Sequence, residues 1–395
     1  MSRIKPFSAV RPNEGWYKDL LGITGGSPDK IGLLKKLLEP RGEKAEENWE
    51  LKTYLYSLET LLHDGNYVID ESPAIYIYER ESSVGSQFGI WVLTSLQDLK
   101  DGKILKHEET LSRHEERLQR YREEVGLEGS PVLLTYHRRP EISSLIEKSV
   151  KCAPDTDFFY EGSHHRLWSI KDEVSIAAFQ VAFAKLENVY VADGHHRLAS
   201  ASAMHNIAPQ WITTLYISAG QLSCSAFHRM ILPDIEFSDS DFSKSINQYF
   251  LVSVISANNP FVPSANNSIG LFYKQQWYLL QLREELTQLM DEPDVRILQD
   301  RILEPIFGIK DPRTDPQLVS WPANQWNEML ETSRGNPRLI LFTLFPMSIN
   351  ELLQQAENHA ALPPKSTYIE PKVPYGLLLH NDKIIKKNMK GILNA

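Results

Sequence analysis

Residues 193–197 place several side chains that can do chemistry next to one another. Asp193 is followed by Gly194, and then come His195, His196 and Arg197. An arginine can hold a phosphate group through two parallel hydrogen bonds, and a histidine can donate to an anion, ligate a metal ion or move a proton. A glycine allows the backbone to approach a ligand closely. The segment therefore predicts a site for a phosphate or another anion.

The flanking sequence predicts that this segment joins a strand to a helix. Residues 189–192 form an apolar, β-branched and aromatic run that is typical of a buried strand, and residues 198–203 favour a helix. The first amide groups of a helix have no acceptor within the helix, and the helix dipole is positive at that end, so such turns bind anions. The alternative is that Asp193 only caps the helix, but capping requires neither the histidines nor Arg197.

Three further side chains are candidates for the same chemistry. His107 and Glu108 lie at the start of a charged segment that is predicted to be a helix. They are candidates for the ligand site, and the alternative is an ordinary solvated helix start. The zinc-protease pattern His-Glu-x-x-His is absent, because Leu111 occupies the position of the second histidine. Arg229 lies in a predicted strand, where it can help to bind an anion or can be a surface arginine.

A stiff segment near the end of the chain carries two lysines. Residues 362–372 contain Pro363, Pro364 and Pro371, which should keep the backbone extended. Such stiffness suits a segment that holds Lys365 and Lys372 against a ligand. The alternative is a rigid strap over the core.

Composition limits the classes of protein to which the chain can belong. The 395 residues are 42% hydrophobic and 24% charged, as in an ordinary globular protein, and the net charge of −9 argues against non-specific nucleic-acid binding. Two cysteines fit a reducing compartment, and neither a signal core nor a membrane-length apolar run is seen. We therefore expect a cytoplasmic protein that acts on a small molecule, with nucleic acid and membranes unlikely as partners and no particular oligomeric state indicated.

The alternation of helical and strand patterns predicts an α+β fold with mixed sheets and flanking helices. We expect a single domain over residues 1–395 with three lobes, at 1–135, 136–235 and 236–395. Predicted helices cover residues 45–63, 142–150, 174–186, 238–249, 295–307 and 349–359. Predicted strands cover residues 74–78, 88–93, 131–136, 189–192, 211–217, 250–255, 269–273, 277–282 and 339–345.

These motifs resemble the domain-of-unknown-function 1015 family, whose hallmark is a strand followed by Ala-Asp-Gly-His-His-Arg, found here at residues 192–197. Other matching stretches are residues 5–7, 11–12, 106–110, 167–170, 308–311 and 363–372. Two departures are residues 25–30, where the family usually carries a Pro-Tyr-Asp-Val-type motif, and Glu128, where an asparagine is common. The motif is also similar to the phosphate-handling loop of the ParB and sulfiredoxin superfamily, which includes nucleotide-dependent free serine kinases.

The resemblance implies a nucleotide-dependent phosphotransferase that acts on a small hydroxyl substrate, similar to a free serine or phosphoserine kinase. ATP or ADP with magnesium would be the cofactor, and serine or phosphoserine the substrate. Gly194, His195, His196 and Arg197 would cradle the phosphate, with Glu108 or Asp193 as base and His107 positioning it. Lys365, Lys372 and Arg229 would neutralise further charge. No Walker loop is present.

Three alternatives remain at this point. The first is a ParB-like nucleotide-binding or DNA-partition module, against which the acidic net charge counts. The second is a metal-dependent hydrolase with ligands from Asp193, His195, His196 and His107, although adjacent histidines rarely point to one ion. The third is a non-catalytic paralogue, because of the two departures from the family pattern. For the phosphotransferase we expect one cleft that contains His107 and Glu108, residues 193–197, and either Lys365 or Lys372.

Overall fold

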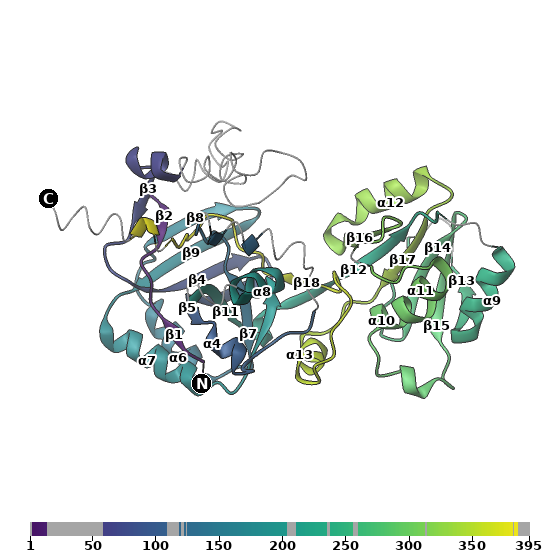
Figure 1. Cartoon of the computed structure of the whole chain (residues 1–395), viewed down its shortest axis with the longest axis horizontal. Helices are drawn as coiled ribbons and strands as arrows, with labels where there is room; N and C mark the ends of the chain where they lie inside the picture. Colours follow the sequence, from purple (N-terminus) through teal and green to yellow (C-terminus); the bar gives the residue numbers. More distant parts are fainter. Residues whose placement is uncertain are drawn as a thin grey trace. The chain divides into compact units, whose positions relative to one another are not determined.

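The computed structural model describes residues 2–13, 58–108, 118–119, 122–123, 125–203, 211–234, 238–255, 260–312, 314–381 and 383–385. Contacts divide the chain into two compact units, whose elements are labelled in Figure 1. The first unit contains Met1–Lys106, Thr110–Leu222 and Pro371–Ala395, and the second contains His107–Glu109 and Ser223–Glu370. No helix in the described part of the chain has the length and apolar character that crossing a membrane requires.

These two units differ from the three lobes that the sequence suggested. Residue 135 was expected to end the first lobe, but it lies inside strand β7 (Val132–Tyr136), which pairs on both sides within one sheet. The change of unit after Leu222 coincides with the start of strand β12 (Ser223–Ile231), which belongs to a second sheet. Composition shifts do not mark these boundaries, because strand pairing rather than composition decides which segments pack together.

The first unit is built on a nine-stranded mixed sheet. Its path runs β6-β10-β7-β11-β5-β4-β9-β8, with β1 paired to β5. The pairs β6–β10 and β7–β11 are parallel and the others are antiparallel. Besides β7, the strands are β1 (Ile4–Lys5), β4 (Ile75–Ser82), β5 (Gly85–Ser95), β6 (Ile104–Leu105), β8 (Thr156–Tyr160), β9 (Ser163–Ile170), β10 (Val189–Asp193) and β11 (Trp211–Ser218). A separate pair is formed by β2 (Val10–Pro12) and β3 (Tyr67–Ile69).

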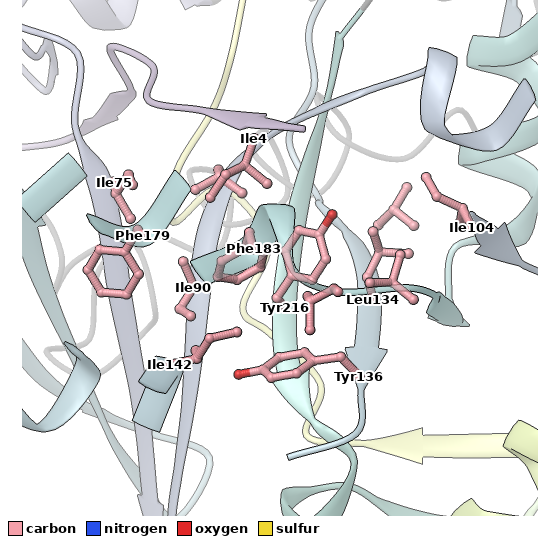
Figure 2. Packing of buried hydrophobic residues seen from close by; sticks show 14 of the residues in the cluster. Ile4, Ile75, Ile90, Ile104, Leu134, Tyr136, Ile142, Phe179, Phe183 and Tyr216 are labelled. Atoms are coloured by element: carbon pink, nitrogen blue, oxygen red, sulfur yellow. The ribbon is translucent and has the colours of Figure 1, made fainter. Parts of the chain in front are cut away.

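Helices supply the other side of the first core. They are α4 (Gln97–Lys100), α6 (Pro140–Ser149), α7 (Glu173–Ala184) and α8 (His195–Ala203). Figure 2 shows Phe179 and Phe183 of α7 among sheet residues that include Ile90 and Tyr216, and all four are fully buried in one cluster. The ring centroids of Phe183 and Tyr216 are 4.8 Å apart in an edge-to-face arrangement, which is favourable for aromatic pairs.

The second unit is built on an antiparallel sheet with the path β13-β15-β14-β17-β12-β16, and β18 also pairs with β12. Its further strands are β13 (Phe250–Val254), β14 (Ser268–Tyr273), β15 (Gln276–Leu282), β16 (Leu318–Pro322), β17 (Ile340–Leu344) and β18 (Thr367–Glu370). Its helices are α9 (Asp239–Tyr249), α10 (Asp294–Leu298), a π-helical turn (Gln299–Leu303), α11 (Glu304–Phe307), α12 (Trp326–Gly335) and α13 (Ile349–Glu357). Ser238 caps α9, and Ser348 with Glu351 forms a capping box on α13.

The α+β class and most of the long elements are confirmed. The strands around Gly85 form an antiparallel hairpin, and the helices predicted at 142–150, 174–186, 238–249 and 349–359 are present with small shifts at their ends. The helix predicted at 295–307 is interrupted by a π-helical turn and ends at Gly308, whose φ is +70°. Strand β9 begins at Ser163, so it includes His164, His165 and Arg166, a second His-His-Arg stretch that lacks an Asp-Gly turn before it. Most of the helix predicted at 45–63, and residues 25–30, lie outside the described residues.

The packing of α7 generates the first testable prediction. Phe183 is 0% exposed, so Phe183→Ala should lower the free energy of unfolding by about 3–5 kcal/mol through lost burial and the cavity left behind. On the same helix Val181 is 60% exposed. Val181→Ala should therefore change the free energy of unfolding by less than about 0.5 kcal/mol. Denaturant titration of the full chain measures both. Equal effects from the two substitutions would contradict the assignment of this core.

Candidate functional site

The turn between β10 and α8 adopts a conformation that favours glycine. Asp193 is the last residue of β10, His195 is the first of α8, and Gly194 between them has a φ of +93°. The first intrahelical bond runs from the amide of Leu198 to the carbonyl oxygen of Gly194 at 3.0 Å. The amides of residues 195–197 therefore point out of the amino end of the helix, where the dipole is positive.

Arg197 folds back over this turn. Its guanidinium donates to Asp193 Oδ2 at 2.6 Å, to Ser130 Oγ, and to the carbonyl oxygen of Pro131. It thereby ties the first turn of α8 to the residues that lead into β7. A Cβ placed on Gly194 would lie only 2.9–3.0 Å from the Arg197 guanidinium, so the absence of a side chain leaves room for this arrangement.

Lys372 completes the cluster from the other side. Its Nζ lies 2.8 Å from Asp193 Oδ1, so Asp193 is held between two cations. Burial opposes ionisation of this carboxyl, but Lys372 and Arg197 outweigh that effect and hold its pKa at about 2. With one carboxylate and two cations, the cluster carries one net positive charge beside the amino end of α8.

The two histidines of the motif face different surroundings. His195 is buried and its positive charge, when present, helps to lower the pKa of Asp193, whereas His196 is half-buried. Because Asp193 is ionised with both oxygens in ion pairs, it is poorly suited to the role of general base that the sequence allowed, for which a pKa near the working pH is best. It is better suited to positioning Arg197 and Lys372.

Glu128, a departure from the family pattern, is part of a buried polar contact in the first unit. Its carboxylate accepts from the guanidinium of Arg122, and its Oε2 also accepts from the backbone amide and the hydroxyl of Thr213, each at 2.7 Å. Both charged side chains are nearly buried. A carboxylate is therefore well accommodated here, where it joins the chain before β7 to β11.

In the second unit, His107 and Glu108 lie beside the proline-rich segment. His107 is buried, its carbonyl oxygen accepts from the amide of Leu362 at 2.8 Å, and its Nε2 lies 3.3 Å from Thr367 Oγ1. Glu108 forms a parallel bridge with Leu362. The contacts of His107 thus hold the beginning of the proline-rich segment in place.

Arg229 is not a surface residue, since it is only 1% exposed. Its guanidinium donates to the carbonyl oxygens of Pro364 and Lys365 and to Ser320 Oγ, at 2.9–3.1 Å. Burial lowers its pKa to about 10, and the negative charge of Glu108 acts in the opposite direction. The exposed Lys365 extends over the ring of Phe227, 5.8 Å from its centroid.

The candidate residues therefore form two groups. The first unit holds Asp193, Gly194, His195, His196, Arg197 and Lys372; the second holds His107, Glu108, Arg229 and Lys365. Because the two groups belong to different units, a single cleft that contains His107, Glu108 and residues 193–197 stays a prediction. Sequence reasoning did not include Ser130, which accepts from Arg197 across 67 residues and carries no motif of its own.

The geometry of the turn generates a second testable prediction. Gly194→Ala should destabilise the first unit by about 1–3 kcal/mol, because the positive φ is strained for alanine and the new Cβ would displace the Arg197 guanidinium. Gly220→Ala is the control, since no atom lies within 4 Å of its added Cβ and its φ is not positive. Melting temperatures measure both. A loss that is the same for both variants would show that the turn does not require glycine.

Similar solved structures include SbnI with a C-terminal truncation from Staphylococcus aureus, at 13% identity and a TM-score of 0.40, covering 77% of this chain and 95% of that one. A conserved hypothetical protein from Pyrococcus furiosus has 11% identity and a TM-score of 0.39, with 75% and 96% covered. A free serine kinase variant in complex with ADP has 10% identity and a TM-score of 0.41, with 74% and 91% covered.

The search of curated proteins finds no match. The family described as "Protein of unknown function (DUF1015)" matches residues 34–301, which is more than half of the chain. The matched range includes the Ala-Asp-Gly-His-His-Arg segment at residues 192–197. On this basis the chain belongs to the DUF1015 family.

Proposed function

We propose that this protein binds a phosphate-bearing small molecule at the amino end of α8 and transfers a phosphoryl group, as a nucleotide-dependent small-molecule phosphotransferase. One observation carries the proposal: the strand–glycine–helix turn at Gly194, with Asp193 holding Arg197 and Lys372 beside it. Helix amides, a positive dipole and a net positive cluster together favour an anion at this place.

The two cations have different parts in the proposal. Arg197 donates to three acceptors of the first unit, so it mainly shapes the turn. Lys372 is 42% exposed and makes its ion pair at the end of a long flexible side chain, so its ammonium group can move between Asp193 and a phosphate oxygen. We therefore assign direct contact with the phosphate to Lys372 and to the amides of residues 195–197.

Phosphoryl transfer depends mainly on positioning and on neutralising charge at the transferred group. A nucleotide, ATP or ADP, would supply or accept the phosphoryl group. Magnesium would be held largely through phosphate oxygens, since both carboxylate oxygens of Asp193 already bind cations. Serine or phosphoserine as the second substrate rests on the resemblance of residues 192–197 to the phosphate-handling loop of the ParB and sulfiredoxin superfamily, which includes free serine kinases.

Proton transfer from the substrate hydroxyl is assigned to Glu108, with His107 as its positioning residue. Asp193 is the weaker candidate, because its pKa is held at about 2. Glu108 is half-buried, so its carboxylate is partly accessible to a substrate. Arg229 lies close enough to interact with the charge of Glu108. The motif at residues 106–110 supports this assignment.

The proposal predicts that Lys372→Met weakens binding of ADP with magnesium about tenfold or more, because a charge-assisted hydrogen bond contributes about 1.5–3 kcal/mol. Lys171→Met is the matched control, since Lys171 is also an exposed lysine of the first unit but lies before α7. Calorimetric titration of ADP, ATP and phosphoserine into the three proteins measures this, and ³¹P NMR with serine measures transfer. Equal affinity in all three proteins would remove Lys372 from the site, and no phosphate transfer in any nucleotide–serine combination would remove the kinase assignment.

A further inference from the structure

A polar cavity of about 620 Å³ lies within the second unit, and none of the candidate residues discussed above lines it. Its walls come from the loop before β14, from the segment that leads into α10, and from α13. Four carboxylates line it, those of Asp291, Glu292, Asp294 and Glu351, and several carboxamides accompany them. Among the described residues that line it there is no lysine, arginine or histidine, so the cavity favours a cation.

Asp294 is the buried member of this set, being only 9% exposed. Its Oδ1 accepts from the backbone amide of Asn267 at 2.9 Å. Its Oδ2, like the side-chain oxygen of Asn267, has no hydrogen-bond partner among the residues that the structure describes. A buried acceptor without a donor is unfavourable, so a donor supplied by a ligand would stabilise this wall.

The other three carboxylates differ in whether the protein already supplies their hydrogen-bond donors. Glu351 is engaged by the protein, because it accepts from Asn266 Nδ2 at 2.6 Å and from the amide of Ser348 at 2.7 Å. Asp291 is exposed and Glu292 half-buried, and no ion pair with a described residue neutralises them. They can therefore offer a second and a third anionic group to a ligand whose first positive group approaches Asp294.

The shape of the site favours an organic cation over a metal ion. In the described part of the chain, no three of these carboxylates bring ligand atoms within chelating distance of one another, and the cavity is far larger than an ion. Met290, Met347 and Phe345 add apolar walls between the polar groups. We propose that this cavity binds an aliphatic polyamine, with one ammonium group donating to Asp294, its methylenes against the apolar walls, and a second ammonium group near Asp291 and Glu292.

The ionisation of Asp294 sets the pH dependence of binding. Burial raises the pKa of this carboxyl to about 7, the charge of Glu351 acts in the same direction, and the amides of Asn267 and Ser268 act against it. An ammonium ligand prefers the ionised carboxylate, so affinity should increase as pH rises from 6 to 8. The other titratable groups that line the cavity are the carboxylates of Asp291, Glu292 and Glu351.

The experiment is a calorimetric titration of spermidine into the full chain at physiological ionic strength, at pH 6 and pH 8, with magnesium and calcium as separate arms. We expect saturable binding of one spermidine that is tighter at pH 8. Asp294→Asn should weaken it at least tenfold and remove most of the pH dependence. Without ligand at pH 8, the same variant should melt at the same temperature as the wild type or higher, because a buried ionised carboxylate has been removed.

Two further variants keep the test independent of any folding defect in Asp294→Asn. Gln354→Lys places a positive charge on an exposed residue that lines the cavity and should abolish binding. Glu331→Gln removes one exposed carboxylate outside the cavity and should leave the affinity unchanged. Equal spermidine affinity in these two variants would show diffuse attraction to the acidic chain and would overturn the proposal. So would saturable binding of a metal ion without binding of spermidine, or no saturable binding at all.

Discussion

The ion pairs of Asp193 are the interaction on which the proposed site depends. One carboxylate joins Arg197, four residues away on α8, to Lys372, which is separated from it by 179 residues. Without that carboxylate, two cations would face each other beside the positive end of a helix, where repulsion would drive them apart. Asp193 therefore stabilises a local excess of positive charge, and Gly194 supplies the space in which the Arg197 side chain folds back.

The local part of this arrangement could be predicted from the sequence, and the long-range part could not. An apolar run before Asp-Gly and a helix-favouring run after it predict a strand, a turn and a helix, because these preferences act over a few neighbouring residues. Nothing in the spacing of residues indicates that Ser130 accepts from Arg197, since this contact is set by the pairing of β7 with β10. Short strands such as β16 and β18 also escaped prediction, because edge pairing uses the backbone and leaves little pattern in the side chains.

The two parts of the proline-rich segment, residues 362–372, have different surroundings. In the second unit the buried Arg229 donates to the carbonyl oxygens of Pro364 and Lys365. After Pro371 the chain belongs to the first unit, where Lys372 reaches Asp193. The two lysines, which looked equivalent in the sequence, thus have different surroundings: an aromatic ring for Lys365 and an ion pair for Lys372.

We have proposed that a phosphate group binds at the amino end of α8. A crystal structure of the full chain with ADP and magnesium tests it most directly. We expect phosphate oxygens about 2.7–3.2 Å from the amide nitrogens of residues 195–197, with the Lys372 ammonium group turned toward them. A nucleotide bound elsewhere, with Lys372 still on Asp193 and no anion at the turn, would contradict it.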